Sequence, residues 1–541
     1  MSTNATRPTL YWLWMWVILL IALPASATTS QPDKAQLESL THIGFHFKKA
    51  IPILTSLEDQ NGDLMLPMFQ AMLNGKLYYN KADRALLIAT KKEGKQVYLN
   101  PFNQQQVGDS NSIQAHKIGI NNALRAHLGN AIARLELDSK DPKQRSAAAQ
   151  ELFGDTSALT IKRIEQVLPN ISKGDTRHKL SLTLHMAQLK NAKDSDAKIK
   201  ALKAIGTPLE PQVRNLLRQS VEQSQDAKVK AMAQKALDKI ASQTSFYHWL
   251  DKVFFGLSLG SVLLLAAIGL AITFGVMGVI NMAHGEMMML GAYTTYVIQQ
   301  VWPNEINQSL WLALPCAFIV SGGVGILIER FVIRYLRGRP LETLLATFGI
   351  SLLLQQLVRT VFSPLNREVA SPDWMSGSLA INPVFSLTYN RLYILIFALI
   401  VFAALMLLLK KTSLGLHVRA VSQNRQMARA LGIRSDRVDA LTFGLGSGIA
   451  GIAGVALSQL TNVGPNLGQS YIIDSFMVVV FGGVGNLFGT VVAAFILGLV
   501  NKFLEPVAGA VLAKIVILVF IILFIQKRPK GLFPQKGRAA D

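Results

Sequence analysis

Residues 256–293 read GLSLGSVLLLAAIGLAITFGVMGVINMAHGEMMMLGAY and decide the fold of the second half of the chain. The side chains from 253 to 280 are almost all apolar or small, and a helix needs about 20 such residues to cross a hydrocarbon core. Asn281, His284 and Glu286 then follow within six positions. Polar groups at membrane depth are costly unless they face protein or water, and backbone breaks there only where it lines a protein-enclosed cavity. We therefore interpret this element as the wall of a solute pathway.

The two halves of the chain differ in composition. Of its 541 residues, 50% are hydrophobic, and the formal net charge is +21. Residues up to position 243 are mixed polar and charged, whereas long apolar runs broken by short basic loops dominate from Tyr247 onward. The length predicts more than one domain. The excess of Lys and Arg is typical of the cytoplasmic loops of membrane proteins, and because no recognition motif accompanies it we expect no nucleic-acid partner.

The amino terminus has the pattern of a secretory signal. Arg7 supplies the charge, residues 11–23 form an apolar core that is short for a membrane span, and residues 24–27 are the small residues of a cleavage site. This pattern predicts a signal peptide over residues 1–27, and a retained anchor is the alternative. Either one places the residues that follow outside the cytoplasm, in the periplasm.

Residues 28–245 contain no run that is long and apolar enough to span a bilayer. Apolar and polar residues alternate over 76–107, around Gly94 and the pair at 100–101, Asn-Pro. This alternation predicts a short antiparallel β meander. Its expected strands include residues 86–88 and 97–99.

Helical periodicity begins at Ile113, and three stretches beyond it resemble one another. They read DPKQRSAAAQEL (141–152), DSDAKIKALKAI (194–205) and DAKVKAMAQKAL (226–237). Each opens with an Asp that can cap a helix, and recurring Ala-rich helical units are typical of a HEAT-type α-solenoid. An ordinary helical bundle is the alternative. Both predict a periplasmic docking or spacer module without catalytic residues.

Apolar segments in residues 247–541 predict a polytopic α-helical membrane domain. They lie at 253–275, 285–301, 309–331, 341–362, 392–409, 438–460, 474–501 and 507–525. The gaps at 331–340 and 410–437 and the tail after 526 are rich in Lys and Arg, which places them in the cytoplasm. The gap at 363–390 has few net charges and should be periplasmic.

An exported amino terminus and a cytoplasmic tail require an odd number of crossings, so one apolar segment must not cross. We assign this role to 474–501, because its centre reads FGGVGN (481–486). Irregular backbone is tolerated inside a protein-lined cavity, and glycine-interrupted segments in the two halves of a transporter point to its pathway. We predict that this segment descends part-way, turns at the glycines and returns, as a broken or re-entrant helix. Glycine-mediated helix packing is the alternative.

Four parts of the second half carry specific motifs. They are GLSLGS with INMAHGEMMMLGAY (256–261 and 280–293), LGLHVRAVSQNRQMARALGI (414–433), FGLGSGIAGIAG (443–454) and KRPKGLF (527–533). Together they resemble the branched-chain amino-acid type of ABC importer permease. The preceding extension, with KLYYNKAD (76–83) before the helical repeats, narrows the resemblance to the B permease subunit of urea ABC importers.

This resemblance implies a multi-pass permease subunit of the bacterial inner membrane that imports urea and is not an enzyme. Its implied partners are a second homologous permease, two ATP-binding subunits, a periplasmic solute-binding protein and membrane lipid. The sequence has no G-x-x-x-x-G-K-[ST] loop, so a partner must hydrolyse the ATP, and no cofactor is expected on this chain. Import of branched-chain amino acids or short-chain amides, and a stand-alone urea channel or secondary transporter, are the alternatives.

The resemblance also implies that residues 413–434 form the cytoplasmic coupling segment, which rests on an ATPase subunit. The implied coupling residues are Asn424, Arg425, Ala428, Arg429 and Gly432. Arg425 and Arg429, four positions apart, predict a cationic stripe on this short helix. Met427, Ala428 and Leu431 predict an apolar stripe beside it. A basic helix resting on anionic lipid is the alternative.

The candidate pathway residues are Asn281, His284, Glu286 and Asn486. Amide and carboxylate side chains can exchange hydrogen bonds with urea, which carries N–H donors and a carbonyl acceptor. A purely structural role is the alternative, in which these groups satisfy the open ends of broken helices. One His and one Glu are too few for a zinc site, so no metal is expected.

Overall fold

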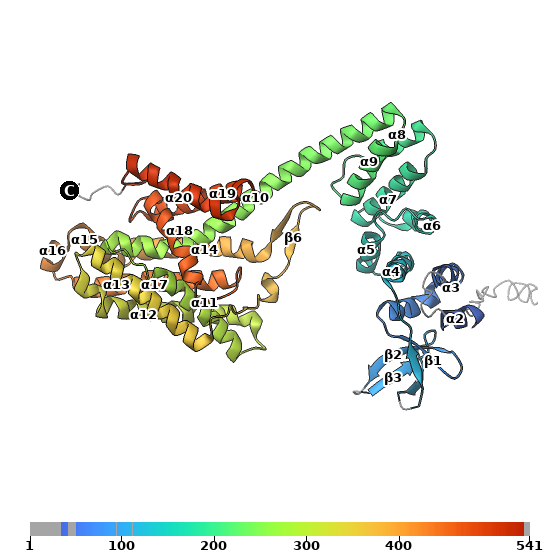
Figure 1. Ribbon diagram of the computed structural model, residues 1–541, viewed down its shortest axis with the longest axis horizontal. Coiled ribbons are helices and arrows are strands. Elements are labelled where there is room, and N and C mark those ends of the chain that lie inside the picture. Colours follow the sequence, from blue (N-terminus) through green and yellow to red (C-terminus); the bar gives the residue numbers. More distant parts are fainter. Residues whose placement is uncertain (1–33, 42–49, 93–94, 111, 535–541) are drawn as a thin grey trace, which may run out of the picture. The chain divides into compact units, whose positions relative to one another are not determined.

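The computed structural model describes residues 34–41, 50–92, 95–110 and 112–534, so the signal peptide expected over 1–27 lies outside the described part. The described chain is mostly helical (Figure 1). It divides into two compact units, Met1–Ile240 and Ala241–Asp541. The boundary between them falls within helix α10 (Ala227–Met277).

The first unit begins with two helices and an antiparallel sheet. These elements are α2 (Lys34–Thr41), α3 (Ala50–Leu73), β1 (Leu77–Asn80), β2 (Leu86–Lys92), β3 (Lys95–Leu99), β4 (Gln106–Asp109) and β5 (Ala115–Lys117). The strand order is β4-β3-β2-β1-β5. The strands expected at 86–88 and 97–99 lie in β2 and β3, where Ile88 pairs with Leu99. The sheet extends beyond the expected meander, because β5 returns to pair with β1.

Helices make up the rest of the first unit. They are α4 (Asn122–Glu136), α5 (Pro142–Glu151), α6 (Ala158–Val167), the 3-10 helix η2 (Leu168–Asn170), α7 (Asp175–Asn191), α8 (Ser195–Ile205) and α9 (Pro211–Gln223). Each Asp expected to cap a repeat accepts a hydrogen bond from a backbone N–H of the helix that follows. The distances are 2.9 Å for Asp141, 3.3 Å for Asp194 and 2.7 Å for Asp226. The relation of these helices to HEAT repeats stays a prediction.

The second unit is helical apart from one short hairpin. Beyond α10 its elements are α11 (His284–Val301), α12 (Ile306–Phe331), the 3-10 helix η3 (Ile333–Leu336), α13 (Pro340–Phe362), the 3-10 helix η4 (Asp373–Met375), β6 (Ser378–Ala380), β7 (Ser386–Thr388), α14 (Tyr389–Lys411), α15 (Ser413–Gln423), α16 (Arg425–Ala430), α17 (Ser435–Ser458), α18 (Leu467–Gly482), α19 (Leu487–Ala508) and α20 (Ala510–Lys527). In the described part of the chain, seven helices are long and apolar enough to cross a membrane: α10, α12, α13, α14, α17, α19 and α20. The predicted polytopic helical architecture is therefore confirmed.

Helices α11, α12 and α17 form the tightly packed centre of the second unit. Most of α17 is buried, and its glycines let the neighbouring backbones approach closely. A β-carbon at Gly454 would overlap the carbonyl oxygen of Met288 in α11, and one at Gly451 would lie 2.6 Å from the carbonyl oxygen of Ala317 in α12. Small residues at such crossings permit van der Waals contact along the whole interface.

The break expected near Asn281 is present, because residues 278–283 between α10 and α11 are not helical. Nε2 of His284, the first residue of α11, donates to the carbonyl oxygen of Ala266 at 3.0 Å. Ala266 precedes Met277, the end of α10, by 277 − 266 = 11 residues, about 16 Å along an α-helix. The chain therefore folds back along α10, and α11 begins deep inside the bundle.

The break expected at 481–486 is also present, and the chain turns there against the carboxyl-terminal tail. Helix α18 ends at Gly482 and α19 begins at Leu487, with positive φ at Gly483 and Gly485 between them. The backbone N–H of Leu532 donates to Phe481 O at 2.9 Å, and that of Phe533 donates to Gly482 O at 3.2 Å. Because these tail residues follow α20, the turn is level with the basic tail. How far the segment descends into the membrane stays a prediction.

Candidate functional site

The three polar residues at the start of α11 are almost fully buried. Oδ1 of Asn281 accepts a hydrogen bond from the backbone N–H of Ala283 at 3.0 Å, which turns the non-helical segment into the helix. His284 faces α10 through its bond to Ala266. Glu286 faces α13 instead, so the three side chains do not converge on one point. In the described residues no group of three or more His, Cys, Asp or Glu could hold a metal ion.

Glu286 is hydrogen-bonded to two side chains in the middle of α13. Its Oε1 atom accepts hydrogen bonds from Ser351 Oγ and Gln355 Nε2, both at 2.8 Å. The side chain is only 1% exposed. A carboxylate oxygen that accepts two hydrogen bonds is well satisfied, so this cluster closes α13 against α11.

Each of the three buried side chains keeps one polar atom without a hydrogen-bond partner among the described residues. These atoms are Asn281 Nδ2, His284 Nδ1 and Glu286 Oε2. An unsatisfied buried polar atom costs about 1–3 kcal/mol, and such atoms in native proteins usually meet water, an ion or a ligand. The start of α11 therefore offers unused donors and acceptors at the centre of the unit.

A stripe of polar residues on α13 was not predicted from the sequence. Its members recur at every fourth position and are Thr343, Thr347, Ser351, Gln355 and Arg359. Thr347 Oγ1 accepts from the backbone N–H of Met282 at 3.1 Å, and an Arg359 Nη2 atom donates to Asn466 Oδ1 at 2.7 Å. Residues four apart lie on one face of a helix, so this spacing was a signal in the sequence that α13 turns a polar face inward.

Asn486 lies apart from the start of α11 and holds the second break together. Its Oδ1 atom accepts from the N–H of Gly489, and its Nδ2 atom donates to Phe533 O, both at 3.1 Å. It borders a pocket of about 310 Å³ that also includes Gly275 and Arg419. The structure thus gives Asn486 a helix-capping role and does not join it to the other three pathway candidates.

The expected coupling segment forms two short helices, α15 and α16, whose elbow is shaped by three of the predicted residues. Asn424 Oδ1 caps α16 by accepting from the N–H of Met427 at 2.9 Å. Ala428 is buried in a small apolar cluster with Val418 and Val438. Gly432 has a φ of +85°, a conformation that glycine adopts without strain.

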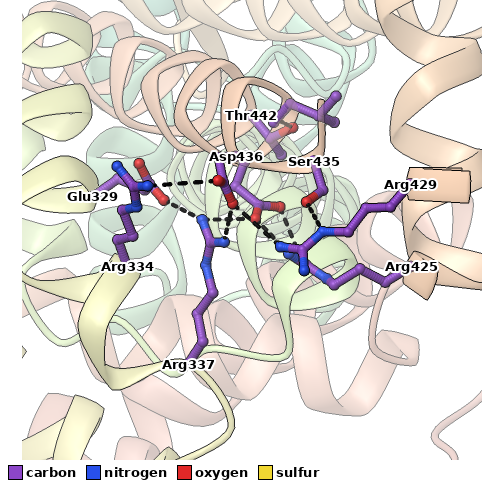
Figure 2. A network of polar contacts seen from close by, with 10 residues as sticks. Glu329, Arg334, Arg337, Arg425, Arg429, Ser435, Asp436 and Thr442 are labelled. Atoms are coloured by element: carbon purple, nitrogen blue, oxygen red, sulfur yellow. Dashed lines mark hydrogen bonds and ion pairs between the residues drawn. The ribbon is translucent and has the colours of Figure 1, made fainter. Parts of the chain in front are cut away.

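The arginines of α16 point toward α17, as Figure 2 shows. The Arg425 guanidinium binds both carboxylate oxygens of Asp439, at 2.6 and 3.0 Å, a geometry of the stronger kind. Arg429 Nε donates to Ser435 Oγ at 2.7 Å. The charge of Arg425 is therefore paired inside the unit, whereas the side chain of Arg429 is 54% exposed, and the coupling role of the stripe stays a prediction.

Apolar side chains form the outward face of the elbow. Met427 is 58% exposed and Leu431 is 76% exposed. Leu416 of α15 is also exposed. The exposed apolar stripe at Met427 and Leu431 agrees with the sequence expectation, whereas Ala428 faces inward. This surface is suited to a protein groove, since exposed apolar groups gain free energy when a partner covers them.

A charge cluster connects the elbow to α12 and α17 (Figure 2). Arg337, between η3 and α13, lies 2.6 Å from Glu329 of α12, 2.6 Å from Asp436 and 2.8 Å from Asp439. Burial works to lower the pKa of Arg337, but its hydrogen bond to Asp436 and the charge of Asp439 raise that pKa above its ordinary value. One cation just before α13 therefore joins α12 to α17, and Asp439 extends the cluster to α16.

The comparisons with known proteins concern the second unit. The family model "Branched-chain amino acid transport system / permease component" matches residues 252–525. The chain is 31% identical over 297 residues to the high-affinity branched-chain amino acid transport system permease protein BraD of Pseudomonas aeruginosa, covering 53% of this chain and 96% of that protein. It is 30% identical over 297 residues to the corresponding protein LivH of Escherichia coli K12, with the same coverage.

A more distant match is the ribose import permease protein RbsC of Bacillus subtilis, 30% identical over 129 residues, covering 23% of this chain and 40% of that protein. No solved structure matches this chain. The family match begins at residue 252 and so leaves the first unit outside it.

The charge cluster predicts that Arg337→Gln destabilises the second unit strongly. Glu329 and Asp439 are fully buried, and removing the shared partner of a buried ion pair costs about 3–5 kcal/mol. Thermal unfolding of the detergent-solubilised protein measures the change. The matched control is Arg339→Gln, two positions along, because Arg339 pairs with Glu342 on the exposed surface, where a pair contributes about 0–1 kcal/mol. Equal midpoints for both variants would contradict a structural role for the cluster.

Proposed function

The chain belongs to the permease family of branched-chain amino-acid ABC importers, which are multi-pass inner-membrane proteins with ATPase and binding-protein partners, and from that premise we propose how it works. With a second homologous permease it lines a solute pathway, and two partner ATPases drive the change of access. A periplasmic binding protein delivers the solute to the outer end. The sequence itself carries no G-x-x-x-x-G-K-[ST] loop, so the energy of ATP reaches it through contact.

The observation that carries this proposal is the construction of the elbow α15–α16. Its outer face is apolar at Met427 and Leu431, while Arg425 is locked to Asp439 of α17. A partner that docks on this face pushes against the elbow, and the Arg425–Asp439 ion pair attaches the elbow to α17. Motion of the elbow is then passed through Asp439 and Arg337 to the first turn of α13.

For the solute, the matched relatives favour branched-chain amino acids, because BraD and LivH are named for their transport. We propose a branched-chain amino acid as the first candidate. Its ammonium group suits Glu286, a buried acceptor with one oxygen that no described residue uses. This assignment replaces urea as the first choice.

Urea remains the second candidate, and one observation favours it. The first unit lies outside the matched range 252–525, so a large part of this chain has no counterpart in the matched relatives. The sequence KLYYNKAD within it resembles the urea importer subunit. In either case we propose that the first unit lies in the periplasm, where it helps to dock the binding protein.

Substituting Met427 and Leu431 together by Glu should prevent ATPase docking. Burying two carboxylates in an apolar groove is unfavourable, and losing two anchors of this type typically weakens association by about tenfold or more. Co-purification of the ATPases with the permease measures the effect. Leu379→Glu on β6 is the control, because Leu379 is also exposed but lies in the segment expected to be periplasmic. Unchanged recovery of the ATPases with the double variant would contradict the proposed docking face.

Reconstitution in proteoliposomes with the ATPases, the second permease and the binding protein tests the function and its solute. We expect ATP-dependent uptake of leucine, and none when the ATPases are omitted. Glu286→Gln should lower leucine uptake by about tenfold or more, because the neutral amide no longer pairs with the ammonium group. Flux of urea or leucine through the permease alone, without ATP, would overturn the importer assignment. ATP-dependent uptake of urea in place of leucine would replace the first solute candidate by the second.

A further inference from the structure

We propose that the contact between α11 and α13 is the gate of the solute pathway, and that a solute opens it by taking the place of Ser351 and Gln355 on Glu286. The inference rests on the proposed function and goes further, because it names the moving helix and the chemistry that moves it. The contact, called the polar seam below, consists of Met282, Glu286, Thr347, Ser351 and Gln355.

The polar seam lies at the depth where transporters bind their solutes. Ser351 is the twelfth of the 23 residues of α13, so it is at the middle of a helix that is long enough to cross a membrane. Glu286 is in the first turn of α11, a helix that starts inside the bundle. Solute sites near the bilayer midplane are commonly built from such interrupted helices.

Helix α13 is attached to the unit by an unusual face. Its fully buried residues are Thr343, Thr347, Ser351, Gln355 and Val358. Only the last of these is apolar, and the partly buried Ile350, Leu354 and Phe362 add apolar contacts beside it. Hydrogen bonds provide the specific polar contacts on this side. Each such hydrogen bond contributes a net of about 0.5–1.5 kcal/mol to stability. Each can also be replaced by an equivalent hydrogen bond to another polar molecule.

Where the glycines of α17 meet α11 and α12, the contacts consist of close backbone packing and not of side-chain hydrogen bonds. There the backbones of neighbouring helices touch at glycines, as at Gly454 against Met288, and no polar molecule can substitute for such packing. On its other side α13 exposes large apolar residues, including Leu345 and Leu353. Of the helices next to α11, α13 is therefore the one whose separation a polar solute can promote.

The chemistry of the polar seam defines the class of solute. Glu286 Oε2 has no hydrogen-bond partner among the described residues, and it is an acceptor for an incoming N–H group. As the solute moves onto Oε1, it releases the Ser351 hydroxyl and the Gln355 amide. These groups can then donate to a carbonyl or carboxylate of the same solute. The gate thus selects small molecules that carry N–H donors beside an oxygen acceptor.

The start of α13 gives the gate a link to the ATPases. Arg337 precedes the first residue of α13, Pro340, by three positions, and it is bonded to Asp436 and Asp439 of α17. Arg425 of the elbow shares Asp439. Displacement of the elbow is therefore transmitted to α13, the helix that the solute loosens. Movement of the elbow and binding of the solute thus both act on the polar seam.

Reversible cross-linking of the polar seam tests this inference. The sequence has one cysteine, Cys316, so Cys316→Ala provides a thiol-free parent. Met282→Cys with Thr347→Cys places two thiols where a backbone N–H and a side-chain oxygen are 3.1 Å apart. A short bifunctional methanethiosulfonate bridges them, and dithiothreitol removes the bridge. In proteoliposomes with the partners, we expect the bridge to lower ATP-dependent leucine uptake by about tenfold or more, since a gate that cannot open limits turnover, and reduction to restore the uptake.

The control pair is Leu379→Cys with Leu387→Cys, which face each other across the β6–β7 hairpin. Cross-linking this pair should leave uptake unchanged. Full uptake with the polar seam bridged would overturn the inference while leaving the importer assignment intact. Absence of ATP-dependent uptake in the thiol-free parent, for leucine and urea alike, would instead count against the proposed function itself.

Labelling of Ser351→Cys in the same parent tests the solute's part directly. The residue is buried in the closed seam, so we expect slow reaction with a polar thiol reagent without ATP and faster reaction during turnover. Saturating leucine in the absence of ATP should also speed the reaction, because a solute on Glu286 releases position 351 from the seam, and urea is the second probe. A labelling rate that neither ATP nor either solute changes would overturn the inference.

Discussion

Backbone that leaves a helix inside a membrane finds no water, so neighbouring protein groups must satisfy its N–H and C=O groups. That constraint governs the interruption between α10 and α11. Asn281 turns the chain into α11, and Thr347 of α13 receives the N–H of Met282. A helix brought in to satisfy the backbone also meets Glu286, which it holds through Ser351. The proposed solute site and the helix that covers it thus have a common physical origin.

Two kinds of contact give the second unit a rigid part and a separable part. Glycines in α17 bring backbones together so closely that any displacement removes many contacts at once. The polar seam of α13 instead relies on hydrogen bonds that a polar solute can replace. The charge cluster around Arg337 and Asp439 joins α12 and α17 near the elbow α15–α16. An importer needs this combination, because force must be transmitted through one region and access must change in another.

Much of this arrangement could be predicted from residue patterns. The polar interruption at Asn281 and the glycines at 481–486 stand out in apolar surroundings, and the caps at Asp141 and Asp194 follow from local hydrogen bonding. The direction in which a side chain points could not be predicted in the same way, because it depends on how helices pack. Arg425 finds Asp439 only when α16 folds onto α17. The second turn is held by the returning tail, whose Phe533 N–H donates to Gly482 O from 51 positions (533 − 482) further along the chain.

The most direct test of the account is the distance between α13 and α12 in the working transporter. Spin labels at Leu353 and Ile319, both exposed, report this distance by pulsed electron paramagnetic resonance in the Cys316→Ala background. Labels at Ile319 and Leu441 report the distance between α12 and α17. Addition of ATP and leucine should shift the first distance distribution by several ångströms and leave the second unchanged. An unchanged first distance, or an equal shift in both, would contradict a separable α13 beside a rigid centre.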